Sequence, residues 1–434
     1  MSRLMKDSGI PWIGSIPFDW QTVKMKQVAD FQPRCDVSGL SADSEITYTP
    51  MECIRNGYFV NNTALYGDLP PSLTPYNNGD IVFAKVTPCF ENGNIAIMEN
   101  LNSGFGLGSS ELFVVRPREI GTRFLFYWLQ NDAFIQQGRA TMTGTGGLKR
   151  VSPYFVKNCP LPLPSDKEQQ SIANFLDAEC ARIDAIIEQT RATVEEYKKL
   201  KQSIITQAVT KGIRPNRPMK DSGIEWIGGM PNDWLLTKVK YVSSLVTDGA
   251  HVSPETENGV YDFVSTVNID GNKIDFDNCL KTSISSYNYL VSTGCKPQIG
   301  DVLISKDGTV GKTVIVNEER DFVVASSLVI IRPKQEMISS EYLNYFLQSK
   351  TVQDTLLLLI HGAGLKRVSV AKNANLTLLL PDKEEQHEIV NYLNDKCKAI
   401  DLLILKKEQY LLELDSLKKA LIFEYVTGKK EAPL

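Results

Sequence analysis

The sequence predicts an α+β protein built as a pseudo-two-fold internal repeat, in which two similar mixed domains are joined by two long antiparallel helices. Two repeated motifs and a shared helical pattern support this prediction. Residues 5–14 (MKDSGIPWIG) return as residues 219–228 (MKDSGIEWIG) with one change, and the stretch LKRVS at 148–152 recurs unaltered at 365–369. A long apolar helical pattern follows LKRVS in each half. A period of about 215 residues is too long for a solenoid unit, so we predict two equivalent domains and a function that comes in pairs.

The composition is that of a protein with a sizeable core and no membrane span. Of the 434 residues, 42% are apolar and 23% are charged, and the longest apolar runs are far shorter than the roughly 20 residues that cross a bilayer. The eight cysteines include no C-x-x-C pair, which favours reduced thiols in the cytoplasm and no zinc site. The net charge of −4 gives no global sign of nucleic-acid binding, so a phosphate-binding surface would need basic residues gathered on one face.

Residues 1–165 and 216–381 are predicted to form the two mixed domains. Each contains short β-branched runs broken by turn residues and then a helical stretch, in the same order in both halves. The matching runs are 80–85 and 301–306, then 111–116 and 327–332, and the matching helical stretches are 123–137 and 341–359. The shared order predicts one framework that is used twice.

A long helix is predicted after each domain, in residues 166–215 and 382–434. Acidic residues after a proline mark each start, and Gly212 and Gly428 mark the ends. Apolar residues recur at spacings of three, four and seven, at Ile172, Leu176, Ile183, Ile187, Val194, Tyr197, Ile204 and Ala208 and at Ile389, Leu393, Ile400, Ile404, Leu411, Leu414, Leu417 and Leu421. Because one apolar stripe needs a partner, and a two-fold axis across the pair would make the helices antiparallel, we predict an antiparallel coiled coil. The alternative is two separate surface helices on independent domains.

Strings that resemble nucleotide-binding motifs have the wrong spacing or position. The sequence GTVGKT at 308–313 is two residues shorter than a P-loop and is typical of a hairpin, and FGLG at 105–108 precedes a strand, whereas a Rossmann loop precedes a helix. The chain contains no Asn-Pro-Pro-aromatic string, so it lacks the base pocket of amino-methyltransferases. We therefore predict no catalytic residue, no cofactor site and no metal site.

The doubled motifs together resemble the specificity subunit of Type I restriction-modification systems. The resemblance rests on the opening Met-Lys-Asp-Ser-Gly-Ile-x-Trp-Ile-Gly-x-x-Pro-x-x-Trp, on Gly-Asp before a strand at 79–80 and 300–301, on Ser-Ser before a strand at 109–110 and 326–327, and on Glu-Gln at the start of each long helix. It covers essentially the whole chain.

The resemblance implies two target-recognition domains that each read one half of a bipartite DNA sequence, with the helical pair as the ruler that sets the gap. It also implies partners, namely double-stranded DNA, two modification subunits and usually two restriction subunits. S-adenosylmethionine is then expected in the modification subunits, ATP and Mg in the restriction subunits, and no cofactor in this chain. Two alternatives stay open: a stand-alone DNA methyltransferase or nuclease, and a two-headed protein-interaction adaptor.

Two loops in each half carry side chains of the types that contact DNA. The first loop follows the Gly-Asp strand, and the second leads into LKRVS. The candidate DNA-binding residues are Lys85, Thr87, Asn92, Asn94, Thr145, Lys149 and Arg150 in the first half and Lys306, Asp307, Thr309, Lys312, Lys366 and Arg367 in the second, with Glu91, Thr143 and His361 beside them. A solvated hairpin is an equal alternative for the first loop. Because LKRVS is identical in both halves, its basic residues are expected to bind phosphate or to form ion pairs, since residues that read different half-sites should differ.

The repeated tryptophans, Trp12 with Trp226 and Trp20 with Trp234, allow two interpretations. Base stacking is one. Packing is favoured, because both copies keep the same spacing beside Ile, Gly and Pro, in a segment expected to tie each domain to the helix ends.

Overall fold

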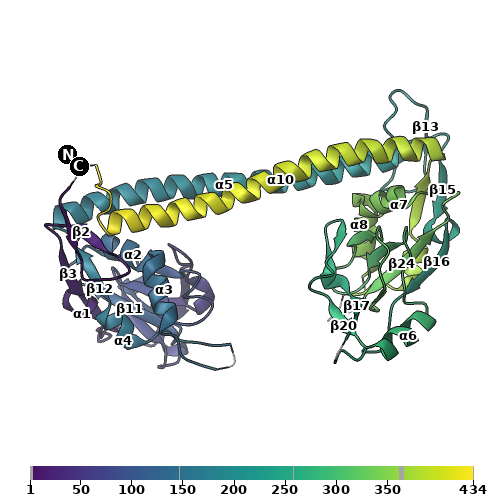
Figure 1. The fold of residues 1–434 in the computed structure, drawn as a ribbon. Helices are drawn as coiled ribbons and strands as arrows, with labels where there is room; N and C mark the ends of the chain where they lie inside the picture. The colour runs from purple at the N-terminus through teal and green to yellow at the C-terminus, as the bar shows by residue number, and fades with distance from the viewer. Residues whose placement is uncertain (1–2, 146, 258, 361–365, 434) are drawn as a thin grey trace. The chain divides into compact units, whose positions relative to one another are not determined.

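The computed structural model describes residues 3–145, 147–257, 259–360 and 366–433 (Figure 1). The chain forms two compact units: unit 1 contains residues 1–191 and 409–434, and unit 2 contains residues 192–408. Each unit combines one mixed domain with part of both long helices. The predicted α+β repeat is confirmed.

The mixed domain of unit 1 contains two four-stranded sheets. In spatial order, the strands of the central sheet are β4 (Ala29–Phe31), β11 (Leu112–Pro117), β8 (Ile81–Ala84) and β9 (Ile95–Ile97). All of these neighbours are antiparallel. The strands of the outer sheet are β6 (Asn62–Leu65), β5 (Glu45–Thr49), β10 (Phe105–Gly108) and β7 (Thr74–Asn77). In this outer sheet, β5 and β10 run parallel.

Helices and short ribbons complete the domain of unit 1. The ribbons are β1 (Met5–Asp7) with β2 (Ser15–Pro17), and β3 (Gln21–Lys24) with β12 (Pro160–Leu163). The helices are α1 (Met25–Val28), α2 (Thr122–Gln130), α3 (Asp132–Ala140) and α4 (Pro153–Asn158), with 3₁₀ turns at Met51–Cys53, Tyr66–Asp68 and Asn102–Gly104. Six consecutive side chains of α2, residues 124–129, are buried, so this helix lies in the core. Asn131 ends it and caps α3, because its side chain accepts a hydrogen bond from the Phe134 amide at 3.0 Å.

The mixed domain of unit 2 repeats the central sheet and differs in the outer one. The central strands are β16 (Ser243–Asp248), β24 (Leu328–Pro333), β21 (Val302–Ser305) and β22 (Thr313–Ile315). The outer sheet has three strands, β20 (Leu280–Thr282), β17 (Tyr261–Val264) and β23 (Phe322–Val324), of which the last two run parallel. The remaining ribbons are β13 (Met219–Asp221) with β14 (Gly229–Pro231), β15 (Leu235–Lys238) with β25 (Thr377–Leu380), and β18 (Ile269–Asp270) with β19 (Lys273–Ile274). The helices are α6 (Ile284–Ser292), α7 (Ser340–Gln348), α8 (Lys350–Leu359) and α9 (Val370–Ala374), with 3₁₀ turns at Val239–Tyr241 and Thr266–Asn268.

One buried ion pair recurs in both central sheets and explains the repeated Gly-Asp motif. Asp80 is fully buried and accepts two hydrogen bonds from Arg116, at 2.7 and 2.8 Å. Asp301 does the same with Arg332, at 2.8 Å each. The hydrogen bonds to Asp80 raise the pKa of Arg116 above its usual value. A charged, two-pronged contact of this kind fixes the start of β8 and β21 against the neighbouring strand.

The two long helices are α5 (Asp166–Lys211) and α10 (Lys383–Val426). In unit 1, Phe175 of α5 stacks on Tyr425 of α10, with ring centroids 4.4 Å apart, and Asp184 pairs with Lys418 at 2.7 Å. Later residues of α5 therefore contact earlier residues of α10, so the helices are antiparallel. Unit 2 shows the same relation, since Lys201 pairs with Asp401 at 2.6 Å, and Gly212, just after α5, lies beside Glu385 near the start of α10. The predicted antiparallel pair is confirmed.

The contact seam departs from the predicted apolar stripe in both helices. Leu417 was expected to face α5, but its side chain is 52% exposed. Lys418 lies in the seam instead, with only 20% of its side chain exposed, and its ammonium reaches Asp184 of α5. Lys201 does the same in the other helix toward Asp401. A lysine can serve there because its aliphatic stem packs while its charge reaches the seam edge.

None of the helices in the described ranges is long and apolar enough to cross a membrane. Among the same residues, no cluster of three or more His, Cys, Asp or Glu could hold a metal ion. The eight cysteines are unpaired, and burial raises the pKa of the Cys159 thiol to about 12.

Candidate nucleic-acid interface

The two candidate loops of unit 1 lie side by side. The Thr87 amide donates to the Lys149 carbonyl at 3.0 Å, and the Val151 amide donates to the Lys85 carbonyl at 2.9 Å. The Thr87 hydroxyl accepts a further bond from the Lys149 amide at 3.0 Å. These bonds join the loop after β8 and the LKRVS stretch into one surface.

Glu111 holds both basic residues at the edge of this surface. Arg150 donates to the Glu111 carboxylate from Nε at 2.9 Å and from Nη2 at 2.6 Å. The Lys85 ammonium lies 3.7 Å from the same carboxylate and donates to the Ser110 carbonyl at 2.6 Å. The hydrogen bonds from Arg150 are the main cause that lowers the pKa of Glu111. Both cations are thereby held in place and partly neutralised.

The corresponding loops of unit 2 pair in the same way. The Gly308 amide donates to the Lys366 carbonyl at 3.1 Å, and the Val368 amide donates to the Lys306 carbonyl at 2.9 Å. The GTVGKT string connects β21 and β22, which pair antiparallel, so its interpretation as a hairpin is confirmed. His361 was expected beside this surface and lies outside the described residues.

A charged cluster that unit 1 does not repeat supports the surface of unit 2. The Lys306 ammonium lies 3.2 Å from the Asp307 carboxylate and 3.5 Å from that of Asp248. Asp307 also accepts bonds from Arg367 at 2.7 and 3.3 Å. At the other end, the exposed His251 ring contacts Asp248 at 2.8 Å through Nε2. The cluster therefore runs from the exposed Arg367, through Asp307, Lys306 and Asp248, to the exposed ring of His251.

Burial changes the roles open to two candidates. Lys306 is 3% exposed and Asp307 is 8% exposed, so neither side chain can reach a base edge. Their pairing fixes the loop instead. The supporting acids Glu111 and Asp248 and the exposed His251 were not predicted from the sequence, because they are distant in sequence from the loops they contact and share no spacing between the halves.

The remaining candidates divide by exposure and contacts. The Lys312 ammonium donates to the Ile269 carbonyl at 2.8 Å, and Asn94 is half-buried. Within the described ranges, the candidates that are exposed and whose side chains make no polar contact are Asn92, Thr145, Lys149, Thr309 and Lys366. Lys149 and Lys366 occupy the same place in both copies, whereas the other three do not correspond.

The repeated tryptophans have different environments. Trp20 and Trp234 are 1% and 0% exposed, and their indole Nε1 atoms donate to Glu168 at 2.8 Å and to Glu385 at 2.9 Å. The packing interpretation is confirmed for this pair.

The other repeated pair does not behave alike in the two copies. Trp12 packs on Trp128 with ring centroids 5.6 Å apart, but Trp226 is 61% exposed, so packing was the wrong expectation for Trp226. The position in α7 that corresponds to Trp128 carries the smaller Phe346, which leaves less ring surface to pack against.

Comparison with known proteins identifies the family to which this framework belongs. The family model described as "Type I restriction modification DNA specificity domain" matches twice, over residues 17–196 and 234–412. The chain is 24% identical over 432 residues to a putative type I restriction enzyme MjaX specificity subunit from Methanocaldococcus jannaschii, which covers 96% of this chain and 95% of that protein. It is 31% identical over 195 residues to the EcoAI specificity subunit of Escherichia coli, which covers 44% of this chain and only 33% of that relative's length.

A solved structure has the same fold. It is described as "Structural basis underlying complex assembly and conformational transition of the type I R-M system", matches with a TM-score of 0.72 at 19% identity, and covers 96% of this chain and 99% of its own. The two family matches coincide with the two halves of the internal repeat. The chain therefore belongs to the Type I restriction modification DNA specificity domain family and carries two copies of that domain.

Proposed function

We propose that this chain is the DNA sequence-recognition subunit of a Type I restriction-modification complex, in which each mixed domain reads one half of a bipartite target. The observation that carries the proposal is the doubled family match on a doubled framework, whose two loop surfaces pair identically along the backbone but differ in side chains. A shared framework with different exposed side chains is what two readers of different half-sites require.

The exposed candidates divide into two roles. Lys149 and Lys366 have free ammonium groups at matching positions, which suits contacts to phosphates that are present in every sequence. Thr309 and the Asn92 and Thr145 side chains differ between the copies and suit base contacts. His251 joins this second group, because Asp248 orients its ring beside the unit 2 loops.

The helical pair is proposed to set the gap between the two half-sites. The 46 residues of α5 correspond to about 69 Å at 1.5 Å per residue. Equivalent readers on one face of B-DNA are expected about one helical turn apart, roughly 34 Å. A helical pair of fixed length would hold the two readers at one such spacing.

The chain is proposed to act without catalytic residues of its own, in the cytoplasm. Its partners are then double-stranded DNA, two modification subunits that bind S-adenosylmethionine, and two restriction subunits that use ATP and Mg. The homologous proteins named above are specificity subunits, which agrees with a recognition role.

Sequencing of methylated bases in a cell that carries this chain with its modification subunit tests the proposal. We expect one bipartite motif with a fixed gap, which disappears when this chain is deleted. A continuous motif, or no motif that depends on this chain, would contradict the proposal. A protein-interaction adaptor would leave no motif and no DNA footprint, and a stand-alone enzyme would modify or cut DNA as the purified chain.

A further inference from the structure

We infer that two repeated clusters, Arg3–Glu168–Trp20 and Arg217–Glu385–Trp234, are positioning sites that fix each recognition domain on the helix ends and thereby restrict the gap that the complex accepts. This inference rests on the proposed bipartite recognition. Among the described residues, no hydrogen bond or ion pair joins either cluster to a candidate DNA-binding residue.

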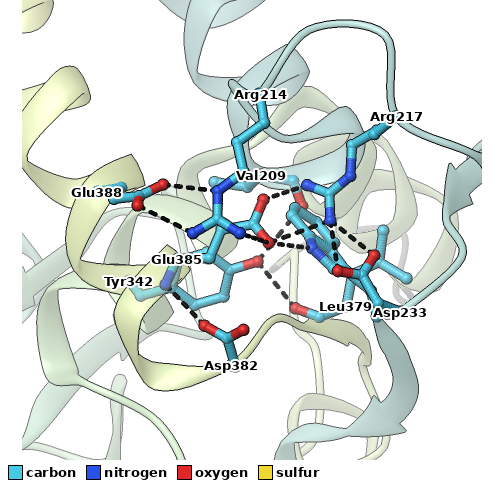
Figure 2. A network of polar contacts seen from close by, with 10 residues as sticks. Val209, Arg214, Arg217, Asp233, Tyr342, Leu379, Asp382, Glu385 and Glu388 are labelled. Carbon is cyan, nitrogen blue, oxygen red and sulfur yellow. Dashed lines mark hydrogen bonds and ion pairs between the residues drawn. The ribbon is translucent and has the colours of Figure 1, made fainter.

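The cluster of unit 2 is built around a buried carboxylate (Figure 2). The Glu385 side chain is fully buried and accepts hydrogen bonds from Trp234 Nε1 at 2.9 Å and from both Nη atoms of Arg217, one of them at 3.2 Å. Arg217 also donates to Asp233 at 2.6 and 2.8 Å and lies 5.5 Å from the centre of the Trp234 ring. Removing a carboxylate from water is costly unless it is compensated in this way, and the compensation holds only in one geometry.

Unit 1 contains the same cluster. Glu168 accepts from Trp20 Nε1 at 2.8 Å and from Arg3, and Arg3 donates to Asp19 at 3.0 Å. The Arg3 guanidinium lies 5.4 Å from the Trp20 ring. Arg3 and Arg217 each stand two residues before the repeated opening motif, which starts at Met5 and at Met219. The cluster is therefore part of the repeat, which favours a role at the joint itself.

Three chain segments meet at each cluster. In unit 2 they are the start of α10, the repeated opening segment and the end of α5. Gly212, which ends α5 with φ +75°, is so close that an added Cβ would lie 2.7 Å from Arg217 and 3.0 Å from Glu385. In unit 1, Gly428 ends α10 with φ +69°, and an added Cβ would lie 2.4 Å from Pro17. In each unit, the end of one long helix and the start of the other thus contact the domain at one point.

A second contact set fixes the same turn of helix to the domain. Gln386, next to Glu385, accepts from the Ser339 amide at 2.9 Å and donates to the Pro381 carbonyl at 3.0 Å. Gln169 repeats both contacts with the Gly121 amide at 2.7 Å and the Pro164 carbonyl at 2.9 Å. The Glu-Gln pair at the start of each long helix is therefore a two-residue anchor between helix and domain.

A joint that fixes the domain angle predicts a specific defect when it is loosened. A domain that rocks on the helix ends can reach half-sites that are one base pair nearer or farther, a shift of about 3.4 Å. Each domain would still read its own half-site, because the loop surface is unchanged. The gap should become less strictly selected while both half-site sequences stay the same.

The test compares Glu385→Gln with Glu388→Gln in the complex with the modification subunit. The first substitution removes the buried charge that faces Arg217. The second makes the same chemical change three residues later, in the exposed pair between Glu388 and Arg214, whose guanidinium reaches Glu385 only at 4.0 Å. The measurement is the ratio of methylation rates on the native target and on targets with the gap shortened or lengthened by one base pair.

We expect Glu385→Gln to lower this ratio by roughly tenfold, and Glu388→Gln to leave it unchanged. Arg217→Lys keeps the charge, loses the two-pronged contact and should give an intermediate ratio. If Glu385→Gln does not fold, the ratio of Arg217→Lys tests the inference in its place. Equal ratios for folded Glu385→Gln, Arg217→Lys and wild type would overturn the inference. If the wild-type complex selects no fixed gap at all, the proposed function fails instead.

Discussion

At the residue scale, the same arginine is paired with a different acid in each half. Arg150 is held by Glu111, which precedes β11, whereas Arg367 is held by Asp307, which follows β21. The repeated LKRVS stretch allowed ion pairing of its arginine to be predicted. The acid that pairs with each arginine could not be predicted, because the two acids come from positions that do not correspond between the halves. The two lysines of the same stretch, Lys149 and Lys366, stay exposed.

This difference predicts distinct effects for two exposed residues of unit 2. Lys366→Ala should weaken binding to all DNA sequences and reduce the salt slope by about one, because a phosphate contact is lost. Thr309→Ala should instead reduce discrimination at one or two positions of a single half-site, by roughly 1–3 kcal/mol per lost base contact. Binding of the complex to single-base target variants at two salt concentrations measures both. A uniform effect of Thr309→Ala with a base-specific effect of Lys366→Ala would reverse these roles.

The buried Lys306 should behave as a structural residue. Lys306→Met would leave the carboxylates of Asp248 and Asp307 without their shared cation, which should lower the free energy of unfolding by about 3 kcal/mol. Adding Asp307→Asn should restore part of the loss, since one uncompensated charge is removed. Denaturant unfolding measures both variants. A stable Lys306→Met protein with altered base preference would instead assign Lys306 to recognition.

The ion pair between Glu111 and Arg150 predicts that the stability of the fold depends on pH. Hydrogen bonds from Arg150 hold the pKa of Glu111 below its usual value of 4.5 in the folded protein. The pair therefore stabilises the fold above that value, and its contribution is lost as pH falls through the lower, folded pKa. As the pH falls from about 5 through the lowered pKa of Glu111, the wild type should lose more stability than Glu111→Gln. Parallel curves for the two proteins would show that this pair contributes nothing measurable.

At the element scale, sequence periodicity predicted the long helices well and the sheets less well. The start of α5 and α10 and their antiparallel pairing follow from heptad spacing and from the repeat. Leu417 shows the limit, because Lys418 takes the seam position by reaching Asp184. The central sheet recurs in both halves as expected from the matching runs, but the outer sheets have four and three strands, since these segments share no sequence pattern.

The helices offer a direct test of spacing. Deleting one heptad from both helices, near Val194 and Leu411, preserves the seam and shortens the pair by about 10 Å, or roughly three base pairs. The methylation motif should keep both half-sites and lose about three base pairs from the gap. If the shortened protein is active and the gap is unchanged, the helices are not the spacer.

At the scale of the whole molecule, one framework is used twice with different surfaces. The buried Asp–Arg pair, the loop pairing and the Arg–Glu–Trp cluster recur in both units, whereas the exposed loop residues do not. Family, repeat and helix pairing were accessible from the sequence. The supporting acids and the buried state of Lys306 were not, because they depend on contacts between segments that are distant along the chain.

The central claim is that each mixed domain reads one half-site independently. It is tested most directly by a chain in which the domain of the second half, residues 234–377, is replaced by residues 20–160 of the first half. The methylated motif of the resulting complex is then sequenced. The pseudo-two-fold repeat predicts that the first half-site will be kept and that its inverted copy will replace the second half-site. A motif that retains the original second half-site, or in which both halves change, would contradict independent reading.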